Sequence, residues 1–98
     1  MGMLFPPPKA LVAGATQVIS ATPNRYKGIV VRETAGGALV LRVWDNATAA
    51  SGTLIDVVSL AASGVESRYL PDSGIACANG IFIERVSGTT YEGSVRLG

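Results

Sequence analysis

The clearest β-strand signal in this 98-residue chain is the stretch Ala38-Leu39-Val40-Leu41-Arg42-Val43-Trp44. Successive side chains of a strand point to opposite sides, so Leu39, Leu41 and Val43 share one face and Arg42 lies on the other. The first face is entirely aliphatic, whereas the second is mixed. This alternation predicts a half-buried strand that lends one face to a hydrophobic core.

Comparable runs recur along the rest of the chain. Each is rich in β-branched or aromatic residues and closes on Gly, Asn, Asp, Ser or Pro, at the spacing of about 8–12 residues that is typical of sandwiches and barrels. The predicted strands are residues 16–20, 26–34, 38–44, 54–60, 65–70, 75–78, 81–86 and 91–97. Gly36-Gly37 and Asn79-Gly80 predict tight hairpin turns. Residues 14–98 are therefore predicted to form an all-β, two-sheet β-sandwich of about eight short antiparallel strands, either Ig-like or jelly-roll-like.

The segment 1–13 differs from the strands that follow it. Three large apolar residues at the start are followed by three prolines, which favour extended polyproline II and cannot continue a helix. A disordered terminus is one interpretation. Apolar residues at a free end favour the other, an extended N-terminal arm that docks on a neighbouring subunit. The predicted partner contacts of this arm are Met3, Leu4, Phe5, Pro6, Pro7 and Pro8.

Trp44 is the other candidate for contact with a partner. It lies in a predicted strand but is offset from the aliphatic face that includes Leu41. Packing in the core is the simpler interpretation of a single tryptophan in a small sandwich. The alternative is a partner-facing position, where tryptophan is a common contributor to binding energy.

The composition is low in charge, which bears on the kinds of partner that the surface can have. Eight Lys and Arg residues oppose seven Asp and Glu residues, and they are scattered singly, so no patch for nucleic acid or an anionic membrane is predicted. Charged residues make up 15% of the chain, against about 25% in ordinary domains. Such a surface is often covered by a partner, although Ala and Gly inflate the apolar fraction. No apolar run approaches the roughly 20 residues of a membrane span.

The sequence lacks the usual components of a catalytic or metal site. It contains no histidine, which removes the commonest general base and metal ligand at neutral pH. Its single cysteine, Cys77, has an apolar setting and predicts a buried, inert thiol. The scattered carboxylates have no calcium-loop spacing, and Asp45 and Asp72 are more simply turn residues. We therefore predict no enzyme activity, no cofactor and no small-molecule substrate, with a hydrolase built from convergent carboxylates as a remote alternative.

Three stretches carry a resemblance to a known class of proteins. They are Leu41-Arg42-Val43-Trp44-Asp45-Asn46-Ala47 with 51–56, Leu70-Pro71-Asp72-Ser73-Gly74-Ile75 with 79–84, and Gly93-Ser94-Val95-Arg96-Leu97. Together they resemble small all-β virion structural proteins of tailed bacteriophages, of the capsid decoration or cement type. The pattern covers residues 15–98 and leaves out the N-terminal segment.

The resemblance implies a location and partners. It implies a structural protein on the capsid surface of a virion, which binds and stabilises the shell of major capsid protein and associates with copies of itself as a dimer or trimer. It supplies no catalytic residue. The alternative is an Ig-like binding or adhesion module of a phage tail or fibre that recognises a glycan or a protein, with the loop at residues 45–52 as its site.

Overall fold

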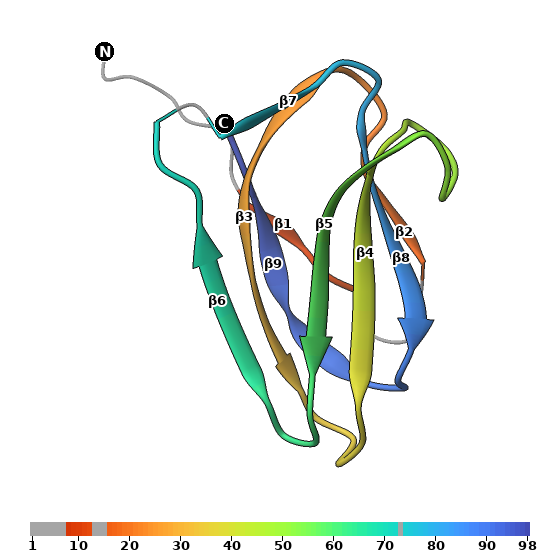
Figure 1. Ribbon diagram of the computed structural model, residues 1–98, viewed down its shortest axis with the longest axis vertical. Coiled ribbons are helices and arrows are strands. Elements are labelled where there is room, and N and C mark those ends of the chain that lie inside the picture. The colour runs from red at the N-terminus through yellow and green to blue at the C-terminus, as the bar shows by residue number, and fades with distance from the viewer. Residues whose placement is uncertain (1–7, 13–15, 73) are drawn as a thin grey trace.

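The computed structural model describes residues 8–12, 16–72 and 74–98, which form two antiparallel sheets packed face to face (Figure 1). This confirms the predicted β-sandwich, and the described residues include no helix. The strands are β1 (Lys9–Ala10), β2 (Gln17–Ser20), β3 (Asn24–Glu33), β4 (Leu39–Asp45), β5 (Thr53–Leu60), β6 (Val65–Tyr69), β7 (Ile75–Cys77), β8 (Ile81–Ser87) and β9 (Tyr91–Leu97).

The two sheets differ in strand order. The five-stranded sheet has the order β1-β9-β3-β6, with β7 paired to β3 beyond the end of β6, and the four-stranded sheet has the order β2-β8-β4-β5. Figure 1 looks onto the four-stranded sheet, with β3 and β9 of the five-stranded sheet behind it. Both sheets therefore have an outer face, and each ends in two edge strands.

The core lies between the sheets and follows the alternation of the sequence. Leu39, Leu41 and Val43 of β4 are fully buried, and they belong to the same hydrophobic cluster as Ile29 and Val31 of β3. The predicted core face of residues 38–44 is therefore confirmed. Because β-branched and leucine side chains fill the inner positions of both sheets, the outer positions are left to contact solvent or partners.

Two predicted hairpins are wrong. The strands on either side of Gly36-Gly37 lie in different sheets, since β3 pairs with β6, β7 and β9, whereas β4 pairs with β5 and β8. The strands on either side of Asn79-Gly80 are also separated, because β7 pairs with β3 and β8 pairs with β2 and β4. In both places the chain turns and crosses from one sheet to the other, and a turn signal alone cannot distinguish these outcomes.

The N-terminal segment is described in part. Met3, Leu4, Phe5, Pro6 and Pro7 lie outside the described residues, and Pro8 is exposed. The next two residues form β1, which pairs with β9, and Leu11 donates its N–H to the carbonyl oxygen of Gly93 at 3.0 Å. Part of the segment 1–13 thus belongs to the five-stranded sheet.

Candidate functional site

An apolar row crosses the outer face of the four-stranded sheet. The register places Val18 of β2 opposite Phe82 of β8, Phe82 opposite Trp44 of β4, and Trp44 opposite Leu54 of β5. Because neighbouring residues on these strands fill the core, the four side chains point away from it. One continuous line of large apolar side chains therefore spans the whole sheet, and we call it the apolar row.

The middle of the apolar row is held by packing and by a hydrogen bond. Phe82 is only 7% exposed although it lies outside the core cluster, which shows that its neighbours on the outer face cover it. Trp44 is half-buried, and its indole N–H donates to Oε1 of Glu84 at 3.0 Å. Glu84 also faces Arg42, with 3.9 Å between Nη1 and Oε1. The simpler expectation, that Trp44 packs in the core, is wrong, and its role in binding a partner stays a prediction.

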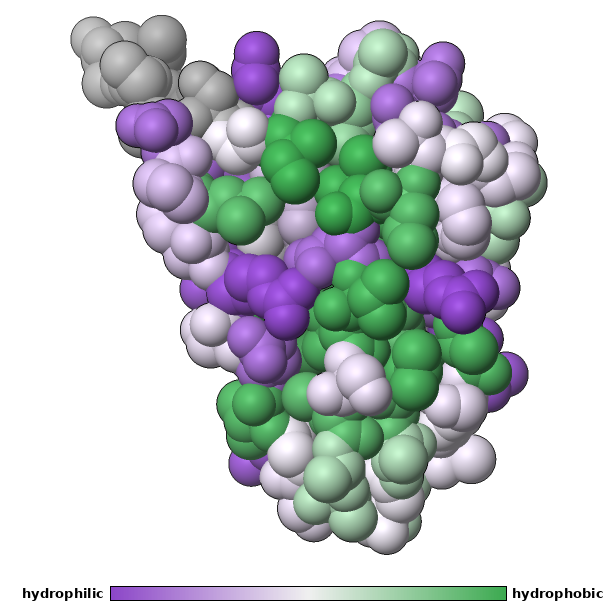
Figure 2. Space-filling view, in the orientation of Figure 1, coloured by the Kyte–Doolittle hydropathy of each residue, from purple (hydrophilic) through white to green (hydrophobic). Residues whose placement is uncertain are grey.

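The ends of the apolar row are open to solvent. Val18 is 40% exposed and Leu54 is 45% exposed. Figure 2 looks onto this face and shows hydrophobic surface gathered over β4, β5 and β8, interrupted by hydrophilic side chains. Val57, which lies opposite Arg42 on β5, adds a further exposed aliphatic side chain. An apolar surface with a polar margin is typical of a protein-binding site.

A polar network joins the two sheets at the flank formed by β5 and β6. The hydroxyl of Tyr26 donates to Oδ2 of Asp56 at 2.8 Å, and the other carboxylate oxygen of Asp56 pairs with Arg68. Nε of Arg68 also lies 3.6 Å from Oε2 of Glu66. Because Tyr26 is on β3 and Asp56 is on β5, this network links the two sheets through side-chain hydrogen bonds.

The hydroxyl of Tyr26 acts in this network as a hydrogen-bond donor that stabilises the fold. Burial raises the pKa of Tyr26 well above its ordinary value of 10, and the hydrogen bond to Asp56 raises it further. The phenol therefore stays protonated at neutral pH. Tyr26 is also fully buried.

Glu33 is a buried carboxylate that the sequence analysis missed. It is 2% exposed, and its two oxygens accept the N–H groups of Ala35 at 2.7 Å, Gly36 at 3.0 Å, Gly37 at 3.2 Å and Ser63 at 2.7 Å. The Ser63 hydrogen bond is the main cause that lowers the pKa of Glu33 below its ordinary value. This residue ties the β3–β4 crossover to the β5–β6 turn. The sequence feature that could have indicated this role is an acidic residue that lies two to four residues before a glycine-rich turn.

The loop between β4 and β5, proposed as a glycan site in the alternative hypothesis, is ordered by Asn46. Its Oδ1 accepts the N–H groups of Thr48 and Ala49, both at 2.9 Å. Its Nδ2 donates to the carbonyl and hydroxyl oxygens of Ser51, both at 3.1 Å. The Asn46 amide is thus occupied within the loop, as expected for a turn residue. Recognition of a glycan by this loop stays a prediction.

The acidic side chains and the cysteine do not form a metal site in the described parts of the chain. No group of three or more His, Cys, Asp or Glu side chains there could hold a metal ion. Cys77 is buried, as predicted, and burial raises the pKa of its thiol. Residues 8–12, 16–72 and 74–98 also contain no helix able to cross a membrane.

The chain matches no protein-family model, no curated protein and no solved structure.

Proposed function

We propose that this protein is a non-enzymatic structural protein of a phage particle that decorates the capsid and stabilises the shell of major capsid protein. The observation that carries the proposal is the apolar row on the outer face of the four-stranded sheet. Trp44 and Phe82 form its centre, and the exposed side chains of Val18 and Leu54 extend it to both edges. This arrangement suits docking on another protein surface.

Two further considerations support the proposal. The short patterns in residues 41–56, 70–84 and 93–97 resemble those of decoration proteins. A repeating shell also presents the same site many times, so a multimer of a small protein gains avidity from individually modest contacts. A small β-sandwich with an apolar row on one outer face fits this role.

The apolar row is tested by one charged substitution within it. Leu54→Lys places an ammonium group at an exposed end of the row, and we expect it to weaken binding to capsid shells by about 10-fold or more, because the charge must be desolvated on docking. Co-sedimentation with empty shells measures the effect. The matched control is Ile75→Lys, since Ile75 is also exposed but lies on β7 in the other sheet, outside both the row and the N-terminal segment. Equal binding by Leu54→Lys and the unmodified protein would contradict the proposal.

The N-terminal arm is tested by a deletion. Removing residues 2–8, which precede β1, is expected to weaken shell binding severalfold while circular dichroism and the melting temperature stay close to those of the full chain. Decoration of empty shells by the truncated protein as tightly as by the full chain would show that the arm does not contribute.

A further inference from the structure

The edge strands of this sandwich are not equally protected against pairing with another chain. At β1, the side-chain amide of Gln17 donates to the carbonyl oxygen of Ala10 and accepts the N–H of Val12, both at 2.9 Å. The outward-facing carbonyl of Ala10 and the outward-facing N–H of Val12 are therefore occupied. An occupied edge cannot template a further strand, which is a common protection against unwanted association.

The β5 edge is also blocked near its middle. The N–H of Val57 donates to Oδ1 of Asp56 at 2.8 Å, and the Val57 carbonyl accepts from Nη1 of Arg68 at 3.3 Å. The two peptide groups that an added strand would need at this position are thus engaged within the chain. The ion pair of Asp56 and Arg68 holds both of these blocking groups in place.

The β6 edge is different, as its hydrogen-bond pattern shows. The backbone N–H of Leu70 donates to the carbonyl oxygen of Lys27 at 2.8 Å, and the backbone N–H of Glu33 donates to the carbonyl oxygen of Gly64 at 2.9 Å. These two pairs bracket the β3–β6 ladder, in which every second residue pair exchanges hydrogen bonds. Glu66 and Arg68 of β6 therefore bond to β3.

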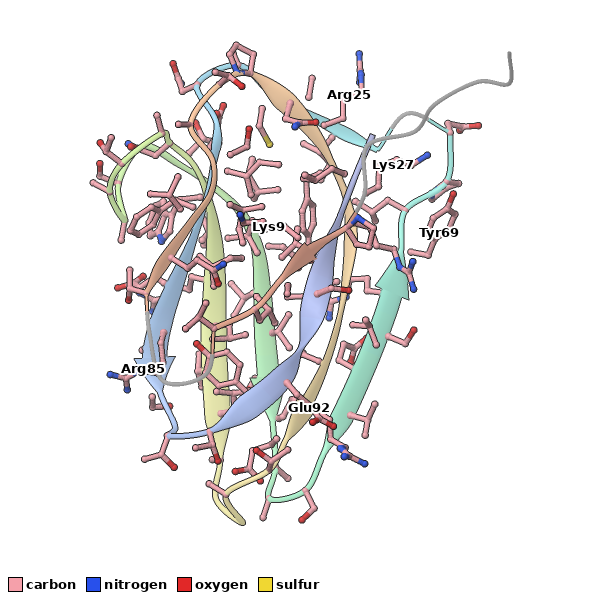
Figure 3. The ribbon with its side chains drawn as sticks, turned by 180° about the vertical axis from the view of Figure 1, so that it is seen from behind. Lys9, Arg25, Lys27, Tyr69, Arg85 and Glu92 are labelled. Carbon is pink, nitrogen blue, oxygen red and sulfur yellow. The ribbon has the colours of Figure 1, made fainter. Side chains whose placement is uncertain are left out.

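The alternate residues Val65, Ser67 and Tyr69 direct their N–H and C=O groups outward. No backbone or side-chain partner for these outward groups occurs among the described residues. Their side chains are also accessible, with Val65 60% exposed and Tyr69 66% exposed. Figure 1 shows β6 at the outer flank of the molecule, and Figure 3 shows Tyr69 at this flank beside Lys27, whose ammonium lies 5.3 Å from the ring centroid.

We propose that β6 pairs antiparallel with β6 of a second copy of this chain, around a two-fold axis that passes beside Ser67. The sequence of β6 is Val65-Glu66-Ser67-Arg68-Tyr69, and it is complementary to itself in this register. Val65 lies opposite Tyr69 of the second copy, an aromatic and β-branched pair that stabilises sheets. Glu66 lies opposite Arg68 of the second copy, so the charges match.

The hydrogen bonding of β6 fits the same register. The axis at Ser67 makes Ser67 with Ser67, and Val65 with Tyr69, the pairs that exchange two backbone hydrogen bonds each. These are the three residues whose peptide groups point outward. Shifting the register by one residue would instead oppose outward groups to groups already bonded to β3. The dimer thereby joins two five-stranded sheets into one continuous sheet, and this inference does not depend on the proposed function.

The dimer is tested through the Ser67 amide. We expect the 10.1 kDa chain to dimerise with a Kd on the order of 10⁻⁵ M, since a five-residue edge buries less than a standard interface. Ser67→Pro removes the outward N–H without removing a β3 hydrogen bond, so it should weaken dimerisation at least about 10-fold in sedimentation equilibrium. The matched control Ser67→Ala keeps the N–H and should dimerise like the unmodified protein.

Cross-linking tests the register independently of stability. In Ser67→Cys, the two thiols face each other across the axis with Cα atoms about 5.5 Å apart, within disulfide range. In Val65→Cys, the thiols are offset by four residues, about 13 Å. Oxidised glutathione should therefore cross-link the first variant and not the second. A monomer at millimolar concentration, an unchanged dimer in Ser67→Pro, or equal cross-linking of both cysteine variants would overturn the proposal.

Discussion

Replacing Glu33 with glutamine is expected to lower the melting temperature by about 10 °C at pH 7. The carboxylate accepts four backbone N–H groups, three from the β3–β4 crossover and that of Ser63 from the β5–β6 turn. The glutamine amide has one acceptor oxygen, and its NH₂ group would face backbone donors. Thermal unfolding followed by circular dichroism measures the loss. Glu92→Gln is the matched control, because Glu92 pairs with Arg32 on the exposed surface, where such pairs contribute little.

The same carboxylate makes stability depend on pH in a defined direction. The pKa of Glu33 in the folded state is lowered from its ordinary value of 4.5, so the unfolded chain binds more protons just below pH 4.5. The stabilisation is therefore complete above this pH and is lost as the pH falls through the folded-state pKa. The difference in melting temperature between the unmodified protein and Glu33→Gln should shrink below pH 4.5. A constant difference from pH 7 to pH 3 would contradict this account.

Gly93→Ala is expected to destabilise the fold by about 3 kcal/mol or more. Gly93 lies in β9 opposite Val31 of β3, with φ at +152°, and a Cβ at this position would overlap the carbonyl oxygen of Val30. The methyl group must push the two strands apart at the centre of the five-stranded sheet. The urea midpoint of unfolding measures the effect, and loss of folded protein on expression is the extreme form of the same outcome.

Two other glycines separate the causes of this effect. Gly36 has φ at +83° but no heavy atom within 4 Å of an added Cβ, so Gly36→Ala reports the backbone strain alone, about 1 kcal/mol. Gly37 also has open space around it and no positive φ, so Gly37→Ala should be close to neutral. If Gly93→Ala costs no more than Gly36→Ala, close strand packing at Gly93 is not the cause.

The surfaces proposed to bind partners could be located only in part from the sequence. Alternation along residues 38–44 placed Trp44 on the face opposite the core residues, yet its size favoured a core position. The register then showed that Phe82 and Leu54 flank it on the same outer face. Because such neighbours come from strands far apart in sequence, the apolar row is visible only after the strands are paired.

The self-complementary sequence of β6 is a second case in which the sequence shows the residues and only the strand pairing shows their role. The residues Val65-Glu66-Ser67-Arg68-Tyr69 are legible in the sequence. Whether their peptide groups are free depends on which side of β6 pairs with β3 and on how the neighbouring edges are blocked. Position at an edge is a property of the sheet, and no local pattern specifies it.

What the sequence by itself determined was the class of fold and the inner face of its strands. Both depend on the two-residue period of a strand, which is a local property, and the structure places Leu39, Leu41 and Val43 in the core as that period predicts. The tertiary structure alone decided which strands pair. At Gly36-Gly37 the turn chemistry is compatible with a hairpin or with a crossover between sheets. The crossover is stabilised by the Glu33 carboxylate, which accepts hydrogen bonds from the N–H groups of the turn. It is also stabilised because both flanking strands bury their apolar faces in the same core.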